Sequence, residues 1–251
     1  VCLSPDTESL EDYIGPIIDS VREPLGTAPL TVFHYNKAEL GANWKLWQDN
    51  NSERYHSLLH FINRKTQPWV IAKTSPMKLR LFDNGHSGYW SDADATVTYE
   101  AGGYKDASVG TLPGMRDNEM RVINIFPDLM INIRANVVRL DRMVPLAPGK
   151  TLVEWRGLGL TDVPEAVEKD RLRHHNMFWG PAGRNLGEDV IAVEAQWASM
   201  ATDVVRYSIL AREEDLNPTD DANVRAYYQE WGRRMGRAPH APLNSGEAQA
   251  L

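Results

Sequence analysis

Cysteine is almost absent from this chain, and its absence excludes several kinds of chemistry. The 251 residues contain one cysteine, Cys2. A single thiol cannot form a disulfide framework, a CxxC redox pair, a zinc ribbon or an iron–sulfur cluster held within this chain. Any metal site here must therefore use histidine and carboxylate ligands.

Basic residues and long apolar runs are also scarce. The chain has 27 Lys and Arg against 34 Asp and Glu, a formal net charge of −7. This balance argues against a nucleic-acid-binding protein, because phosphate recognition needs a basic surface. No apolar run approaches the roughly 18 residues of a membrane-spanning helix. The hydrophobic share of 42% is ordinary for a globular protein, and we expect one domain with a sizeable core.

The first residues do not have the pattern of a secretion signal. The chain begins Val1-Cys2-Leu3 without methionine, and it lacks the basic segment and long apolar core of a signal peptide. Ser4-Pro5-Asp6 then reads as a loop that follows the end of a strand. We expect this chain to be a piece of a longer one.

Hydrophobic periodicity predicts strands followed by helices. The strands are expected at 29–35, 122–126, 129–138 and 151–158, with an irregular region containing one or two hairpins at 64–117 and a strand-like piece at 95–99. Helices are expected at 9–21 with a kink at Pro16, at 165–179 with Pro164 at the first helical position, at about 186–200, and from an N-cap at 219–221 to about 237. This order indicates an α+β fold with an antiparallel sheet.

A further helix is predicted from Asn43 to Phe61, and it carries the only histidines with ligand-like spacing. At 100° per residue, Asp49, Glu53, His56 and His60 fall within about 60° of one another. The two imidazoles, at i and i+4, could reach one metal ion. The alternative is an amphipathic surface helix with its polar face in water, but this face has little solubilising charge.

Two separated stretches share a resemblance to one family. The first stretch contains Asn43-Trp44-Lys45, Asp49-Asn50, Glu53, Tyr55-His56 and His60 in that order. The second is the turn Gly180-Pro181-Ala182-Gly183, followed by Glu188-Asp189. These stretches, with Ile125–Leu129 between them, resemble the α subunits of Rieske-type, non-haem iron ring-hydroxylating oxygenases. The resemblance runs from the first residues to about residue 200.

The resemblance implies roles for individual residues. His56, His60 and Asp189 would be the ligands of a mononuclear Fe(II), a facial triad that leaves the other coordination positions open. Glu53 matches a bridging carboxylate, usually Asp, that links His56 to the cluster domain of a neighbouring subunit; its alternative is an ordinary exposed Glu. Asn50 matches a polar residue beside the iron, with simple helix hydrogen bonding as its alternative. Each histidine needs an acceptor on its other ring nitrogen, and Asp49 is a candidate.

The resemblance also implies the fold and the reaction. The fold would be the helix-grip (START/Bet v 1-like) type, an antiparallel sheet wrapped around helices with a long C-terminal helix. Residues 1–251 would form the catalytic mononuclear-iron domain, and an N-terminal Rieske [2Fe–2S] domain would be absent from this chain. The enzyme would be a bacterial, cytoplasmic oxygenase that hydroxylates or dihydroxylates a small aromatic substrate with O2. Electrons would come from NADH through a separate reductase, with or without a ferredoxin, and the α subunits would form a homotrimer, with or without β subunits.

One departure from the family leaves alternatives open. Three residues separate the histidines instead of the more usual four, and the ending Leu58-Leu59-His60 is similar to that of salicylate- and terephthalate-type oxygenases, a hint of an acidic aromatic substrate. A monooxygenase or demethylase would use the same iron ligands. A non-catalytic helix-grip module would bind no iron. A zinc hydrolase is disfavoured because Glu53 does not lie between the histidines, as the HExxH motif requires.

Two remaining patterns have structural interpretations. His174-His175 is expected to be a surface or packing pair on the helix before the Gly-Pro-Ala-Gly turn. Gly157-Leu158-Gly159 lacks the strand–turn–helix context of a nucleotide-binding motif.

Overall fold

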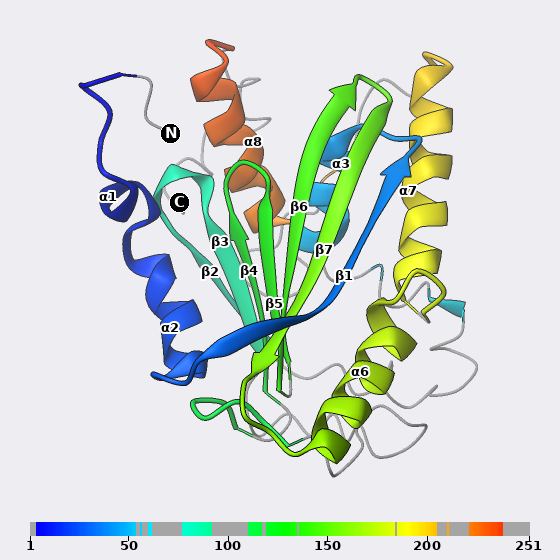
Figure 1. Cartoon of the computed structure of the whole chain (residues 1–251). Coiled ribbons are helices and arrows are strands. Elements are labelled where there is room, and N and C mark those ends of the chain that lie inside the picture. The colour runs from blue at the N-terminus through cyan, green and yellow to red at the C-terminus, as the bar shows by residue number, and fades with distance from the viewer. Residues whose placement is uncertain are drawn as a thin grey trace.

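A single antiparallel sheet organises the computed structural model, which describes residues 4–53, 56, 60–61, 77–91, 110–116, 119–134, 136–183, 185–204, 210 and 221–237. Its seven strands lie in the order β1-β7-β6-β5-β4-β3-β2 (Figure 1). Strands β2 to β7 form a continuous meander, and β1 pairs with β7 at the edge. The strands are β1 (Leu30–Leu40), β2 (Met77–Leu81), β3 (Ser87–Ser91), β4 (Met120–Ile125), β5 (Leu129–Arg134), β6 (Val137–Ala147) and β7 (Lys150–Leu160).

The helices pack mainly on one side of the sheet. In Figure 1, α3 (Trp44–Ser52) and α8 (Ala222–Arg234) lie behind the strands, and α7 (Leu186–Ala201) lies beyond β1 on the right, above α6 (Glu165–Trp179). On the left are α1 (Leu10–Ile14), η1 (Gly15–Ile18) and α2 (Asp19–Leu25), and a short turn, η3 (Asp83–Gly85), joins β2 to β3. No helix in the described part of the chain is long and apolar enough to cross a membrane.

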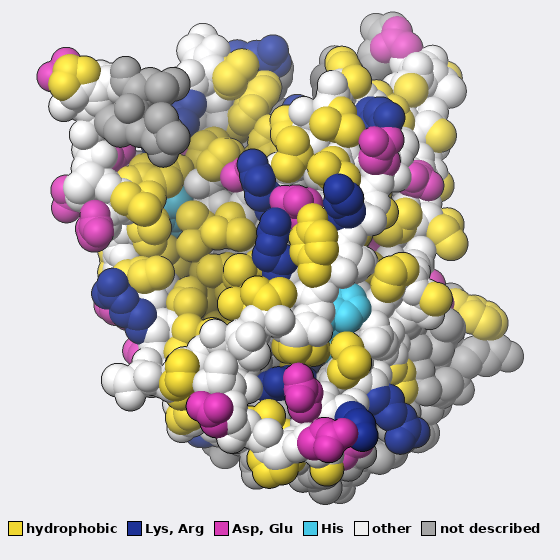
Figure 2. Space-filling view, viewed as in Figure 1, with side chains coloured by type: hydrophobic (Ala, Val, Ile, Leu, Met, Phe, Trp, Pro, Cys, Tyr) yellow, Lys and Arg dark blue, Asp and Glu magenta, His cyan; other side chains and the backbone are white. Residues whose placement is uncertain are grey.

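Successive side chains of a strand point to opposite sides of the sheet. In the central strands, buried apolar side chains lie on both faces. On the helix side, Val122 and Met130 pack with Ala222 of α8. On the other side, Ile123 and Ile133 pack with Ile17 of η1. Figure 2 shows hydrophobic side chains gathered on this second face, where several of them are only partly buried, among them Leu129, Leu140 and Leu158.

A second core holds α3 and α7 against the sheet. Trp47 of α3 and Val193 of α7 belong to one buried cluster with Met143 of β6 and Trp155 of β7. The rings of Trp47 and Trp155 meet edge to face with centroids 5.5 Å apart. This packing fixes the start of α7 relative to the end of α3, and the candidate site lies there.

Most of the predicted elements are confirmed. The α+β class and the antiparallel sheet are as expected, α6 has the predicted bounds, and α7 and α8 lie within a few residues of theirs. The 9–21 helix is divided at Pro16 into α1, η1 and α2. The hairpin β2–β3 lies in the irregular region, whereas the piece at 95–99 lies outside the described residues.

Three bounds are corrected. The predicted strand at 129–138 is two strands, β5 and the start of β6, and β1 continues five residues beyond the predicted end at Tyr35. Pro164 is the N-cap of α6 and precedes the first helical residue. Its extended ψ of 144° is incompatible with a position inside the helix.

The predicted helix from Asn43 to Phe61 is wrong after Ser52. Asn43 caps α3 by accepting the Lys45 N–H at 3.1 Å, but Glu53 is extended (φ −89°, ψ 161°). Two hydrogen bonds, one tertiary and one local, compete with continuation of the helix at this point. The Ser52 carbonyl accepts the Asn223 side-chain amide from α8, and the Glu53 carboxylate accepts the His56 N–H at 3.0 Å.

The paired glycines of β7 allow α6 to dock. A Cβ on Gly159 would lie 2.2 Å from Nη1 of Arg171, and a Cβ on Gly157 would lie 3.0 Å from Cε1 of His175. Both partners are fully or almost fully buried. The two glycines therefore serve helix–sheet packing, and His174-His175 is a buried packing pair.

Candidate metal centre

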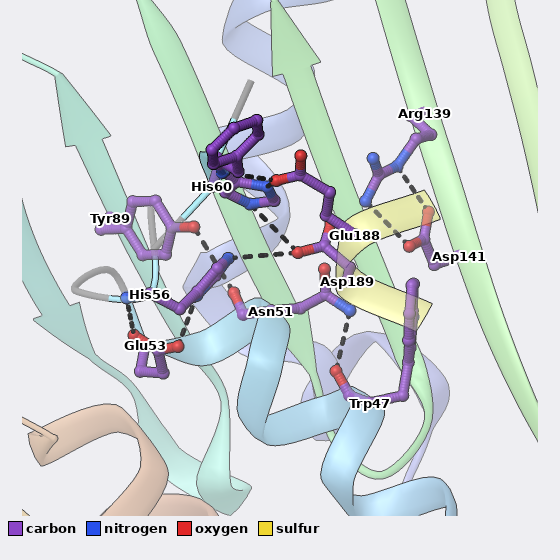
Figure 3. Close-up of polar contacts among 11 residues, drawn as sticks. Trp47, Asn51, Glu53, His56, His60, Tyr89, Arg139, Asp141, Glu188 and Asp189 are labelled. Carbon is purple, nitrogen blue, oxygen red and sulfur yellow. Dashed lines mark hydrogen bonds and ion pairs between the residues drawn. The ribbon is translucent and has the colours of Figure 1, made fainter. Parts of the chain in front are cut away.

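Three side chains from distant parts of the chain converge in one place. His56 and His60 follow α3, and Asp189 lies in the first turn of α7. The potential ligand atoms of the three residues all lie within 4.8 Å of one another. Oδ1 of Asp189 is 3.2 Å from Nε2 of His60 and 3.6 Å from Nε2 of His56 (Figure 3). The structure therefore brings together all three predicted ligands.

The geometry of this group fits a metal ion. Two ligand atoms about 2 Å from a metal and at right angles to each other are roughly 3 Å apart, close to the spacings seen here. Oδ1 of Asp189 is buried and makes no hydrogen bond of good geometry, although Nε2 of His60 lies 3.2 Å away. An unsatisfied buried acceptor is unfavourable, and a cation would satisfy it. Two imidazoles and one carboxylate are the donor set of a facial Fe(II) site.

Each histidine is held on its other ring nitrogen by a glutamate. The Glu53 carboxylate is hydrogen-bonded to Nδ1 of His56 and also accepts the backbone N–H of His56. Oε2 of Glu188 lies 3.0 Å from Nδ1 of His60 and accepts the Phe61 N–H at 2.9 Å. With Nδ1 engaged in this way, Nε2 of each ring faces Asp189 (Figure 3).

The charge balance of the site favours a cation. Burial lowers the pKa of His60, but the neighbouring carboxylates Asp189 and Glu188 outweigh this effect, and its pKa is raised above the usual 6.5. A metal ion would replace that proton, because metal-bound imidazole is neutral. His60 is 6% exposed, so bulk water has little access to its side of the site.

The structure changes one of the predicted supporting roles. Asp49 does not contact either histidine: it accepts the Tyr228 hydroxyl of α8 at 2.9 Å, so its predicted part as the histidine acceptor is wrong. The acceptors are Glu53, which is buried and not an ordinary exposed residue, and Glu188. Asn50 lies half-buried on α3, and its place beside a metal stays a prediction.

Sequence reasoning missed Glu188. A signal for it was present, because it directly precedes the predicted ligand Asp189. Its partner His60, however, is 128 residues away, and only the folded chain shows that the two meet.

Comparison with known proteins agrees with this geometry. Residues 28–237 match the family described as ring hydroxylating alpha subunit (catalytic domain). The chain belongs to this family. Because the match covers most of the chain, the predicted recognition as the catalytic domain of a Rieske-type oxygenase α subunit is confirmed.

Two curated relatives of this family are 37% identical to the chain. One is the 2-aminobenzenesulfonate 2,3-dioxygenase subunit alpha of Alcaligenes sp., aligned over 94% of this chain and 60% of the relative. The other is the methanesulfonate monooxygenase hydroxylase subunit alpha of Methylosulfonomonas methylovora, aligned over 100% of this chain and 60% of the relative. The chain thus spans 60% of the length of these relatives.

Solved structures support the fold. The naphthalene 1,2-dioxygenase of Rhodococcus sp. superposes with a TM-score of 0.72 at 17% identity, covering 94% of this chain and 64% of that one. The predicted helix-grip type of fold is therefore confirmed.

The buried carboxylate of Asp49 also has an electrostatic consequence. Burial raises its pKa from 3.8 to about 7; the Tyr228 hydroxyl and Lys45 oppose the shift, and Asp221 and Glu53 add to it. Folded protein therefore holds a proton at Asp49 between about pH 4 and pH 7 that the unfolded chain has released. The contribution of Asp49 to stability therefore falls as the pH rises through this window.

We predict that Asp49→Asn removes this pH dependence in the metal-free protein. Asn cannot ionise but keeps an oxygen that accepts the Tyr228 hydroxyl. The variant should match the wild type near pH 4 and be more stable near pH 8 by on the order of a few kcal/mol, as measured by urea unfolding. Asp19→Asn, at an exposed carboxylate, is the control. A difference from the wild type that does not change with pH would contradict the prediction.

Proposed function

We propose that His56, His60 and Asp189 hold one Fe(II) ion and that this site hydroxylates a small organic anion with O2. The observation that carries the proposal is the convergence of two imidazoles and a buried carboxylate oxygen without a hydrogen bond of good geometry, held from two separate elements. Membership in the ring-hydroxylating family supports the metal and the class of reaction.

The protein's own residues prepare the site for this chemistry. Fe(II), when bound, would bring O2 and substrate together at the positions that a facial triad leaves open. Glu53 and Glu188 occupy the Nδ1 atoms, so both Nε2 lone pairs are available on one side.

The remaining parts of the enzyme are proposed on the family alone. Residues 1–251 would be the catalytic mononuclear-iron domain of a longer α subunit that also has a Rieske [2Fe–2S] domain. NADH would supply electrons through a reductase, with or without a ferredoxin. Transfer to the iron from the cluster of a neighbouring subunit would require a homotrimer, with or without β subunits.

We infer that the substrate is an organosulfonate. The two relatives at 37% identity are named for an aromatic and an aliphatic sulfonate, which share only the C–SO3⁻ group. Two guanidinium groups lie on the helix side of the sheet: Arg139 is paired bidentately with Asp141 at 2.7 and 2.9 Å, and the half-buried Arg134 lies about 6 Å from the ring centres of Phe178 and Trp179. A guanidinium in such surroundings suits a sulfonate.

The ligand assignment predicts that Asp189→Ala loses its mononuclear iron. The lost carboxylate leaves two neutral imidazoles, which bind Fe(II) far more weakly. Iron content after anaerobic reconstitution, beyond any iron in a Rieske cluster, should fall from about one per chain to below one tenth. Glu194→Ala, on the same helix but away from the site, should keep its iron. Folded wild-type protein without iron would instead favour a non-catalytic ligand-binding module.

The proposed reaction predicts incorporation of labelled oxygen. With a reconstituted electron-transfer chain and ¹⁸O2, an aromatic sulfonate should give hydroxylated product containing ¹⁸O, at a kcat/KM at least about tenfold above that of the unsubstituted hydrocarbon. One labelled oxygen atom in the product indicates monooxygenation, and two indicate dioxygenation. Equal turnover of the hydrocarbon would refute the sulfonate, and unlabelled products would refute the oxygenase.

Glu53 is proposed to link His56 to the electron-donating cluster. Glu53→Gln keeps the size of the side chain and removes its charge, so iron should remain while NADH-coupled turnover falls about tenfold or more. Glu39→Gln, on exposed β1, is the control. Unchanged turnover in Glu53→Gln would remove the bridging role.

A further inference from the structure

One carboxylate oxygen ties the His60 segment to α7. Oε2 of Glu188 lies 3.0 Å from Nδ1 of His60 and accepts the next backbone N–H, that of Phe61, at 2.9 Å. The Phe61 side chain is 58% exposed, so its burial contributes little to holding this segment. Glu188 therefore holds both the ring of His60 and the backbone that follows it (Figure 3).

The adjacent carboxylate approaches the same ring from its other nitrogen. Oδ1 of Asp189 is 3.2 Å from Nε2 of His60. A neutral imidazole has one N–H, and either carboxylate could accept it. If the proton were on Nε2, it would be bonded to Asp189, and two potential metal ligands would be engaged with each other. With the proton on Nδ1 and bonded to Glu188, Nε2 and Oδ1 both have free lone pairs.

We propose that Glu188 is the positioning residue that holds His60 in its metal-binding tautomer and orientation. The inference rests on the proposed function, because it presupposes that His60 and Asp189 are ligands. Glu188 would act on the metal through His60, because its carboxylate bonds to Nδ1 of His60 and to the Phe61 N–H. Its place next to Asp189 on α7 means that one helical turn supplies both a ligand and the residue that aligns a second ligand.

Three substitutions separate the hydrogen bonds from the charge. Glu188→Gln keeps an oxygen that can accept from both Nδ1 of His60 and the Phe61 N–H, and it loses only the charge. Glu188→Asp keeps the charge on a side chain one methylene shorter. Glu188→Ala loses both. If the position of the hydrogen-bonding oxygen matters more than its charge, Glu188→Gln should preserve metal binding better than Glu188→Asp or Glu188→Ala.

A matched control lies six residues further along the same helix. Oε1 of Glu194 accepts the Gly41 N–H at 2.8 Å, just as Oε2 of Glu188 accepts the Phe61 N–H at 2.9 Å. Glu194→Ala therefore removes a carboxylate that ties α7 to a distant backbone N–H, without touching a histidine.

The test is calorimetric titration of the metal-free protein with Co²⁺, with the absorption bands of the bound ion and the melting temperature of the metal-free form as further readouts. We expect Glu188→Ala to bind Co²⁺ about 10–100-fold more weakly, Glu188→Gln to stay within a few-fold of the wild type, and Glu194→Ala to be unchanged. The metal-free melting temperatures of the wild type and the Gln variant should be similar, and metal should raise the melting temperature less in the weaker binders.

The outcomes distinguish this inference from the proposed function. Wild-type protein that does not bind Co²⁺ would overturn the metal site itself. A wild type that binds, with Glu188→Ala within about threefold of it, would overturn the role of Glu188 alone. If Glu188→Gln bound Co²⁺ as weakly as Glu188→Ala, the inference would also be overturned, because the position of the hydrogen-bonding oxygen would then not matter. If Glu188→Ala does not fold, the Gln and Asp variants make the same comparison, and equal affinity of the two would contradict the inference.

Discussion

The packing of α7 against α3 and the helix side of the sheet is the constraint on which the site depends. Trp47, Trp155 and Val193 form the buried cluster that holds the two helices together. Because this contact fixes the first turn of α7, Asp189 is delivered to two histidines that follow α3. Hydrophobic burial, which has no directional preference of its own, therefore sets a polar geometry through the rigidity of the elements it joins.

The early end of α3 is the second feature that shapes the site. A regular helix through residue 61 would place Glu53 and His56 on one continuous face. Instead the chain turns at Glu53, Asn223 of α8 satisfies the carbonyl of Ser52, and the Glu53 carboxylate reaches both the ring and the backbone of His56. The site is therefore surrounded by carboxylates: one between the two Nε2 atoms and one on each Nδ1 atom.

Much of the fold could be predicted because its elements are locally encoded. The bounds of α6 follow from Pro164 and the Gly180 break, and the strands from their β-branched runs. The convergence of His56, His60 and Asp189 was expected only through resemblance of two separated motifs, since spacing along one helix could not include Asp189. The spacing argument itself was misleading for Asp49, because it assumed a helix that continues to Phe61, whereas the helix ends at Ser52.

The sequence by itself determined the chemical inventory: one cysteine, a histidine pair with nearby carboxylates, an acidic balance, and runs of strands followed by runs of helices. The resemblance already linked Glu53 to His56, but tertiary structure alone decided that Glu188 serves His60 and that Asp49 serves neither histidine. Glu53 and Glu188 took the Nδ1 atoms, and Asp49 was turned toward Tyr228 on α8. The reason is physical: a hydrogen bond depends on distances of a few tenths of an ångström, and those distances are set by how α3, α7 and α8 pack.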